Sequence, residues 1–235
     1  MSEGLSGTAV VVTRPAEQAN ELIEALQAAG ATVIAAPGIE IEPLSDSELG
    51  DDAGTPAGRS HWIVFISRNA VRHGTGLLAA RLGDASRRPR IAAVGPGTAE
   101  ELVRHGWTVD AAPARGGGGD DLLAEPDFDP GDGERVLIVR GEGGSAALAE
   151  SLRARGADVT HLAVYRRRAA TADVGALQSG WQSAHQRVTI VTSDGGIRAL
   201  VAGLPSDTRR ELLRSHPVTL SERLAETARA LGFSE

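Results

Sequence analysis

The chain has 235 residues, which suits one large domain or two small ones, and it contains no cysteine, so a disulfide, a thiolate metal site and a cysteine nucleophile are excluded. Its formal net charge of -7 argues against sequence-independent binding of nucleic acid, which requires a basic surface. No apolar run approaches the roughly 18 residues of a membrane span, and residues 1–7 lack the regions of a signal peptide, so we expect a soluble cytoplasmic protein with no membrane contact.

Aliphatic strands alternate with helical segments along the whole chain. Such continuous apolar strands are typical of a parallel sheet that helices cover on both faces. The sequence therefore predicts an α/β fold made of two small, doubly wound parallel sheets. The expected strands cover residues 9–13, 32–36, 61–66, 91–94 and 108–112, and then 135–139, 159–165, 188–192 and 217–220.

The second half of the chain repeats the first at a constant spacing. The same offset separates Arg14 from Arg140 and Gly30 from Gly156, and each of these glycines is expected to end a helix. One offset across separated blocks indicates a duplicated unit. The second copy stops where the fifth strand of the first begins, so we expect it to lack that strand. Further matched pairs are Ser67 with Ser193, Arg72 with Arg198, and Glu100 with Glu226.

Two segments carry little information on function. Residues 45–60 are rich in Asp, Gly and Ser and are expected to form a surface loop. Residues 116–119 are four glycines ahead of an expected helix at 120–124. A phosphate loop is one interpretation of these glycines, but a linker is favoured because no Lys-Ser or Lys-Thr follows them.

Short polar loops follow the expected strands. In open α/β sheets, ligands bind beyond the carboxyl ends of the strands, where helix N-termini offer backbone N–H groups. Capping is the alternative for each loop, because Thr98 with Glu101 matches a capping box and Pro15 suits the first helical position. The candidate residues for binding carboxylates or phosphates are Thr13, Arg14, Ser67, Arg68, Asn69, Gly97, Thr98, Arg140, Gly141, Ser193 and Ser221.

Tyr165 is the single tyrosine of a chain with only 3% aromatic residues, and it ends an expected strand immediately before three arginines, residues 166–168. Nearby positive charge favours the ionised form of a phenol, so Tyr165 can act as a weak acid or a hydrogen-bond donor. The alternative is an amphipathic ring at a strand end with its hydroxyl in water.

Several other chemistries lack their motifs. No GxGxxG follows the first strand, so no dinucleotide cofactor is expected. The six histidines show no i, i+4 pairing or HxxxH cluster, so no metal is expected. No GxSxG sequence is present to supply an acyl-transfer nucleophile.

Several motifs resemble one known family. They are VVVTRP near the start, PGIEIEPL after the second strand, FISRNAV, AVGPGTAEELVRHG, and the pair Val164-Tyr165. In this order and spacing, from about residue 9 to residue 232, the chain resembles the uroporphyrinogen-III synthases.

The resemblance implies two flavodoxin-like domains that are not the sequential halves of the repeat. The first would comprise residues 1–39 and 167–235 and would lack its final strand, and the second would comprise residues 44–162. A two-stranded ladder at 38–43 and 162–168 would join them into a bilobal protein with a central cleft.

The resemblance also implies a monomeric lyase that needs no cofactor. Its substrate would be linear hydroxymethylbilane, a polycarboxylate, which is cyclised to uroporphyrinogen III with inversion of ring D and loss of water in tetrapyrrole biosynthesis. Tyr165 would face the cleft and act on the departing hydroxyl group. The loop residues named above would bind the substrate carboxylates.

The sequence departs from the family pattern at two of the loops expected to bind the substrate. Ser221-Glu222-Arg223-Leu224-Ala225 stands where Gly-Pro-Thr-Thr-Ala is common, and Asp194-Gly195 replaces Pro-Ser. The two added acids are expected to repel an anionic substrate. A bilobal binding protein for a small polyanion, without catalysis, is the alternative function. A sugar- or nucleotide-modifying enzyme is a third possibility that no motif supports.

Overall fold

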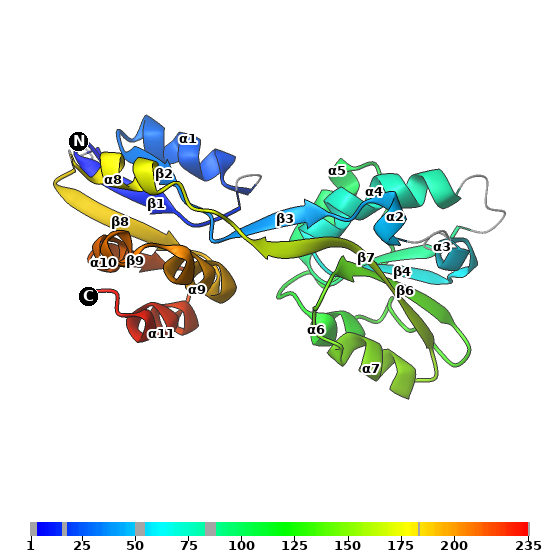
Figure 1. The fold of residues 1–235 in the computed structure, drawn as a ribbon. Coiled ribbons are helices and arrows are strands. Elements are labelled where there is room, and N and C mark those ends of the chain that lie inside the picture. The colour runs from blue at the N-terminus through cyan, green and yellow to red at the C-terminus, as the bar shows by residue number, and fades with distance from the viewer. Residues whose placement is uncertain (1–3, 16–17, 50–54, 83–87, 183, 235) are drawn as a thin grey trace. The chain divides into compact units, whose positions relative to one another are not determined.

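The computed structural model describes residues 4–15, 18–49, 55–82, 88–182 and 184–234. The chain divides into two compact units, which we name unit 1 (Met1–Glu40 with Arg168–Glu235) and unit 2 (Ile41–Arg167). Each unit contains a largely parallel sheet flanked by helices (Figure 1). The prediction of an α/β fold with parallel sheets is therefore confirmed. No helix of the described residues is long and apolar enough to cross a membrane.

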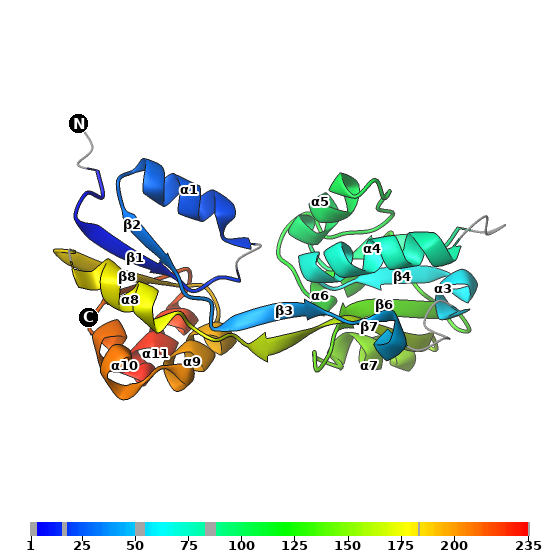
Figure 2. The ribbon, with the colours of Figure 1, turned by 45° about the horizontal axis from the view of Figure 1, so that its top comes forward.

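Unit 1 has a parallel sheet with the strand order β2-β1-β8-β9. Alternate side chains of β1 reach opposite faces, as the period of a strand requires. Val10 and Val12 pack toward α1, and Ala9 and Val11 pack toward the helices of the other face. Figure 2 shows α1 on one side of this sheet and α8, α9 and α10 on the other. The strands are β1 (Thr8–Val12), β2 (Thr32–Ala35), β8 (Gln186–Val191) and β9 (His216–Thr219), and the helices are α1 (Asn20–Ala28), α8 (Val174–Gln182), α9 (Asp194–Gly203), α10 (Ser206–Leu213) and α11 (Glu222–Leu231).

The sheet of unit 2 has the order β3-β7-β6-β4-β5. Ile63 and Phe65 of β4 pack against α4 and α5, whereas Trp62 and Val64 pack against α6 and α7. The strands are β3 (Ile39–Pro43), β4 (Trp62–Phe65), β5 (Arg90–Ala93), β6 (Arg135–Gly141) and β7 (Asp158–Ala169), and the helices are α2 (Asp46–Leu49), α3 (Thr55–Arg59), α4 (Arg68–Leu82), α5 (Pro96–Arg104), α6 (Gly119–Leu123) and α7 (Ala147–Ala154).

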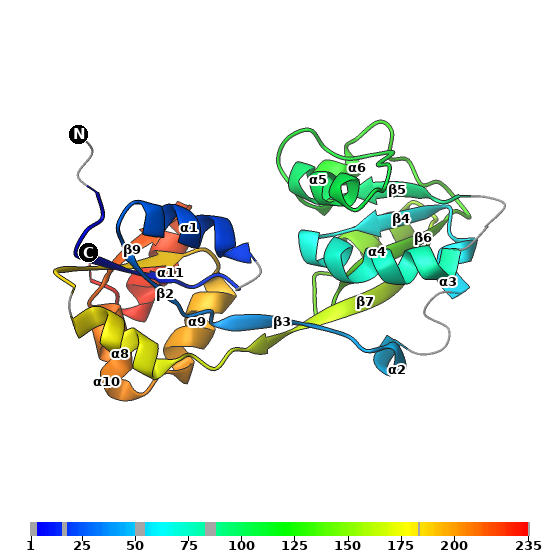
Figure 3. The ribbon, with the colours of Figure 1, turned by 90° about the horizontal axis from the view of Figure 1, so that it is seen from above.

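The chain passes from one unit to the other within β3 and again within β7. These two strands are neighbours and run in opposite directions (Figure 3). Backbone hydrogen bonds hold the connection at both ends, from Leu44 N to Val164 O at 3.1 Å and from Ala170 N to Gly38 O at 3.0 Å.

Several expected elements need correction. The strand predicted at 108–112 is reduced to one isolated bridge between Ala92 and Ala111. The strand predicted at 159–165 is longer, because β7 continues to Ala169 along β3. Helix α1 begins only at Asn20, so Pro15 is not its first residue. In the part of unit 1 that the structure describes, no strand pairs beyond β9.

Matching glycines end the repeated helices. Gly30 follows α1 with φ 92°, and Gly156 follows α7 with φ 90°. Both lie in the left-handed region, which glycine adopts without a steric penalty. The predicted helix ends are therefore confirmed at both positions.

Candidate functional site

Tyr165 lies in the core of unit 2. Its side chain is only 1% exposed and belongs to the apolar cluster beneath α4. The hydroxyl oxygen is 3.2 Å from Ser67 Oγ and 3.2 Å from a guanidinium nitrogen of Arg167. Arg167 also lies over the ring, 5.6 Å from its centroid. The hydroxyl is thus held by protein groups, so the alternative with this group in water is wrong.

A bulge in the sheet places Tyr165 in this core. The register between β6 and β7 shifts after Arg140, which pairs with Ala163, so that Gly141 pairs with Tyr165 and Val164 is passed over. Val164 and Tyr165 therefore pack into the same cluster, although neighbours in a regular strand point to opposite faces. A Cβ at residue 141 would lie 2.5 Å from ring carbons of Tyr165, so glycine is required there.

One of the two hydrogen bonds at the Tyr165 hydroxyl has a fixed direction. A guanidinium group can only donate, so the phenol oxygen accepts from Arg167. In the contact between Tyr165 and Ser67, either hydroxyl can be the donor. Ser67 Oγ also accepts from Ala70 N at 3.0 Å at the start of α4. When the phenol is the donor, Ser67 Oγ accepts two hydrogen bonds, and the half-buried Ser67 is left with its own hydroxyl proton for a further partner.

The neighbouring Arg166 has a different role. It pairs with Glu48 and lies 3.7 Å from Glu142. Hydrogen bonds from the Ser45 backbone and hydroxyl, followed by that from Arg166, lower the pKa of Glu48 to about 2. Arg166 therefore ties β7 to α2.

The structure also joins two of the predicted loops. The Nε of Arg68 donates to Gly97 O at 3.1 Å, and a Cβ at residue 97 would lie 2.5 Å from this guanidinium group. Asn69 and Thr98 are buried next to them in the chain. Thr98 is not a capping residue, because Gly95 occupies the N-cap of α5 without a side-chain bond. The capping-box interpretation is therefore wrong.

Arg140 lines a cavity of about 330 Å³ near the carboxyl ends of β4, β5 and β6. Gly118, Gly119 and Ser145 line the same cavity, together with His161, whose Nδ1 is 3.4 Å from Arg140. Burial, followed by the charge of Arg140, lowers the pKa of His161, which keeps the imidazole neutral at pH 7. The sequence interpretation missed Gly118, Gly119 and His161 here, although the glycine run ahead of a helix was the available signal.

The hydroxyl groups predicted for the site in unit 1 form hydrogen bonds with backbone groups. Thr13 Oγ1 donates to Ile190 O at 2.8 Å. Ser193 Oγ accepts from Gly196 N at the start of α9, and Ser221 Oγ accepts from Leu224 N at the start of α11. The capping alternative therefore holds for both serines. Arg14 makes a long contact of 3.5 Å with Gln18 O.

The two added acids of unit 1 have local partners. A hydrogen bond from Thr227, followed by one from Arg198, lowers the pKa of Asp194. Glu222 pairs with Arg229 at 2.5 Å. Each negative charge is thus compensated by an arginine of its own helix, which reduces the repulsion expected from the sequence. Among the described residues, no group of three His, Asp or Glu side chains could hold a metal ion.

The predicted site residues therefore fall into separate groups. In unit 2, Tyr165 meets Ser67 and Gly141, Arg68 meets Gly97, and Arg140 lines the cavity. The other set belongs to unit 1, where its members follow β1, β8 and β9, namely Thr13, Arg14, Ser193 and Ser221.

Comparison with known proteins gives a consistent result. The family model of uroporphyrinogen-III synthase HemD matches residues 20–235. The uroporphyrinogen-III synthase of Escherichia coli is 30% identical over 227 residues, covering 96% of this chain and 92% of that protein. That of Synechococcus elongatus is 33% identical over 170 residues, covering 70% of this chain and 62% of that protein.

Solved structures share the fold at lower identity. A mutant uroporphyrinogen III synthase from Thermus thermophilus has a TM-score of 0.61 at 20% identity, covering 97% of this chain and 90% of that one. The Helicobacter pylori enzyme has a TM-score of 0.56 at 15% identity, covering 96% and 89%. On the family match and the identity to the Escherichia coli protein, the chain belongs to the uroporphyrinogen-III synthase family.

Proposed function

We propose that this chain closes hydroxymethylbilane to uroporphyrinogen III, with inversion of ring D and loss of water, and that Tyr165 acts in this reaction through Ser67. Family membership supports the overall reaction. The observation that supports the residue roles is the buried phenol held between Arg167 and the half-buried Ser67.

The first step of the reaction needs a proton. When the C–O bond of the hydroxymethyl group breaks, the oxygen leaves as water only if it receives a proton, and a positioned acid accelerates such a step. Tyr165 is too deeply buried to touch this oxygen, whereas the hydroxyl of Ser67 can donate to it. Ser67 then takes the phenol proton, and the positive charge of Arg167 stabilises the phenolate that forms.

The proton balance closes within one turnover. Loss of water leaves a cationic azafulvene, and attack by the ring D carbon followed by rearrangement ends with the release of one proton. That proton restores Tyr165. We further propose that Arg68 and Arg140 bind substrate carboxylates. Arg68 retains N–H donors beyond its contact with Gly97, and Arg140 retains them beyond its contacts with Gly141 and His161.

A set of variants at two positions tests this proposal. With hydroxymethylbilane made in situ, Tyr165→Phe and Ser67→Asn should each lower kcat by roughly a hundredfold to ten-thousandfold, the range of lost acid catalysis. The double variant should lose no more activity than the more impaired of the two single variants, because the two groups act in series. Ser67→Asn keeps a capping side chain for α4, and Ser67→Thr, which keeps the hydroxyl, should stay active.

The isomer produced separates the overall function from the residue roles. Wild-type protein that yields only the non-enzymatic type I isomer at every enzyme concentration would reject the synthase function and favour the binding protein. Losses that multiply in the double variant would reject the series arrangement while leaving the synthase function in place.

A further inference from the structure

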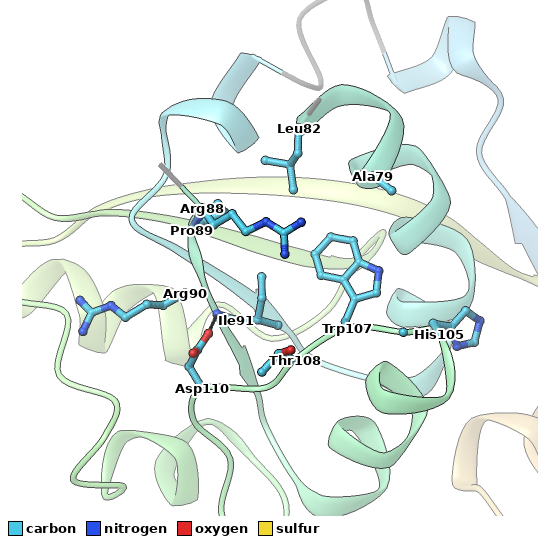
Figure 4. Close-up of a pocket in the computed structure, with 11 residues that line it drawn as sticks. Ala79, Leu82, Arg88, Pro89, Arg90, Ile91, His105, Trp107, Thr108 and Asp110 are labelled. Carbon is cyan, nitrogen blue, oxygen red and sulfur yellow. Dashed lines mark hydrogen bonds between the residues drawn. The ribbon is translucent and has the colours of Figure 1, made fainter. Parts of the chain in front are cut away.

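A second cavity lies at the other end of the unit 2 sheet. It has a volume of about 520 Å³ and is bounded by the start of β5, the end of α4 and the segment that follows α5 (Figure 4). Tyr165 and Arg140 lie toward the carboxyl ends of the parallel strands, whereas this cavity lies at their amino ends. Its size is within the range of small-molecule sites.

Arg88 is the cation available to a ligand in this cavity. It is exposed and makes no hydrogen bond or ion pair with any described residue. Arg90, by contrast, pairs with Glu134 at 2.9 Å and lies 4.1 Å over the ring of Trp62. Figure 4 shows the guanidinium group of Arg88 directed toward Trp107.

Trp107 supplies an aromatic surface. It packs edge-on against Phe65, with ring centroids 5.8 Å apart, and remains half-buried, whereas Trp62 and Trp181 are buried. An indole beside a guanidinium group that has no partner among the described residues suits a flat ring that carries a negative group.

Asp110 restricts the chemistry further. Its Oδ2 accepts from Ile91 N at 2.7 Å, and its Oδ1 has no hydrogen bond among the described residues. A carboxylate in the wall repels a ligand that is anionic throughout, but it accepts a hydrogen bond from a ring N–H. The lining thus includes a cation, a carboxylate acceptor and an aromatic face, together with the polar side chains of Arg90, His105 and Thr108.

We propose that this cavity binds a heteroaromatic carboxylate whose ring carries an N–H group. Its carboxylate pairs with Arg88, its ring packs on Trp107, and its N–H donates to Asp110. The site is separate from the Tyr165 group and does not depend on the proposed function.

Two nearly isosteric compounds test the proposal. Indole-2-carboxylate carries the N–H, whereas benzofuran-2-carboxylate has an oxygen in its place. We would titrate each into the ¹⁵N-labelled full chain and follow the indole N–H signal of Trp107, assigned with Trp107→Phe. Indole-2-carboxylate should shift this signal saturably, and benzofuran-2-carboxylate should bind several-fold more weakly.

Variants identify the contacts. Arg88→Ala should weaken binding of indole-2-carboxylate roughly tenfold or more, as expected for a charged hydrogen bond, and Arg88→Lys should weaken it less. Asp110→Asn should remove the preference between the two compounds. Arg223→Ala, which removes an exposed arginine of unit 1, should change neither titration. A wild-type Trp107 signal that does not respond, equal binding of the two compounds, or unchanged binding by Arg88→Ala would overturn the proposal.

Discussion

At the scale of single residues, Glu101 shows how unit 2 stabilises a buried charge. Its side chain on α5 is only 4% exposed, and Oε1 accepts from Arg72 of α4 at 2.8 Å. Arg104 lies 2.9 Å from the other oxygen. Burial raises the pKa of Glu101, but the hydrogen bond and charge of Arg72 and the charge of Arg104 outweigh it and lower the pKa overall.

Glu101→Gln should therefore destabilise the protein by about 1–3 kcal/mol at pH 7, because Arg72 and Arg104 lose their charged partner. The loss is limited because both arginines are partly exposed to solvent. The pKa of Glu101 is lower in the folded state, so its contribution is fully present above the ordinary value of 4.5 and is lost as the pH falls through the lowered value. Urea unfolding of the wild-type protein and of Glu101→Gln at pH 7 and pH 3 measures this contribution to the free energy of unfolding.

The difference between wild-type and Glu101→Gln midpoints should shrink at pH 3. Glu222→Gln, at an exposed pair with Arg229, is the matched control and should change stability by less than about 0.5 kcal/mol. A difference that is constant between the two pH values would contradict the assigned pairing.

At the scale of elements, α4 contains two glycines with opposite surroundings. Gly74 faces the sheet, and a Cβ there would lie 2.8 Å from a methyl carbon of Val139. Gly76 is exposed, and nothing lies within 4 Å of a Cβ at its position. Only the first glycine is needed for the close packing of α4 against β6.

Gly76→Ala should stabilise the protein by about 0.5–1 kcal/mol, because alanine restricts the unfolded chain and favours the helix. Gly74→Ala, two residues away in the same helix, should destabilise it by about 1–3 kcal/mol through overpacking. Chemical denaturation measures both changes. Equal effects of the two substitutions would show that α4 does not pack as described.

At the scale of the whole molecule, each unit has its own hydrophobic clusters. Those of unit 1 surround β1 and β8, and those of unit 2 surround β4 and β6. No buried cluster in the described residues draws on both units. A local defect should therefore loosen one unit more than the other.

Gly38→Ala provides such a defect, because its Cβ would lie 1.8 Å from the carbonyl oxygen of Gly196 in α9. Hydrogen exchange should show lost protection in β1 and β8, with protection in β4 and β6 largely retained. Gly195 lies in α9 next to Gly196, and nothing lies within 4 Å of a Cβ at its position. The control Gly195→Ala should therefore leave both units protected. Equal loss in both units by Gly38→Ala would indicate one cooperative structure.

The sequence by itself determined the features that have a local or periodic signal. Apolar strands alternating with helices predicted the α/β class, and Gly30 and Gly156 marked helix ends because only glycine adopts a positive φ without a steric penalty. The order and spacing of five motifs, including those around Ser67 and Tyr165, were sufficient to predict the family. The predicted strand at 108–112 was wrong because apolar residues indicate burial without indicating a partner strand.

Only the tertiary structure decided what surrounds the functional residues. The shift between Arg140 and Gly141 turns Tyr165 into the core, toward Ser67 and Arg167, although strand alternation places it on the face opposite Val164. Likewise, Arg140 and Gly118 come together across a cavity, and Arg88 meets Trp107 across another. Such contacts depend on a bulge in the strand pairing and on loop closure, and the alternation of residues along a single strand specifies neither.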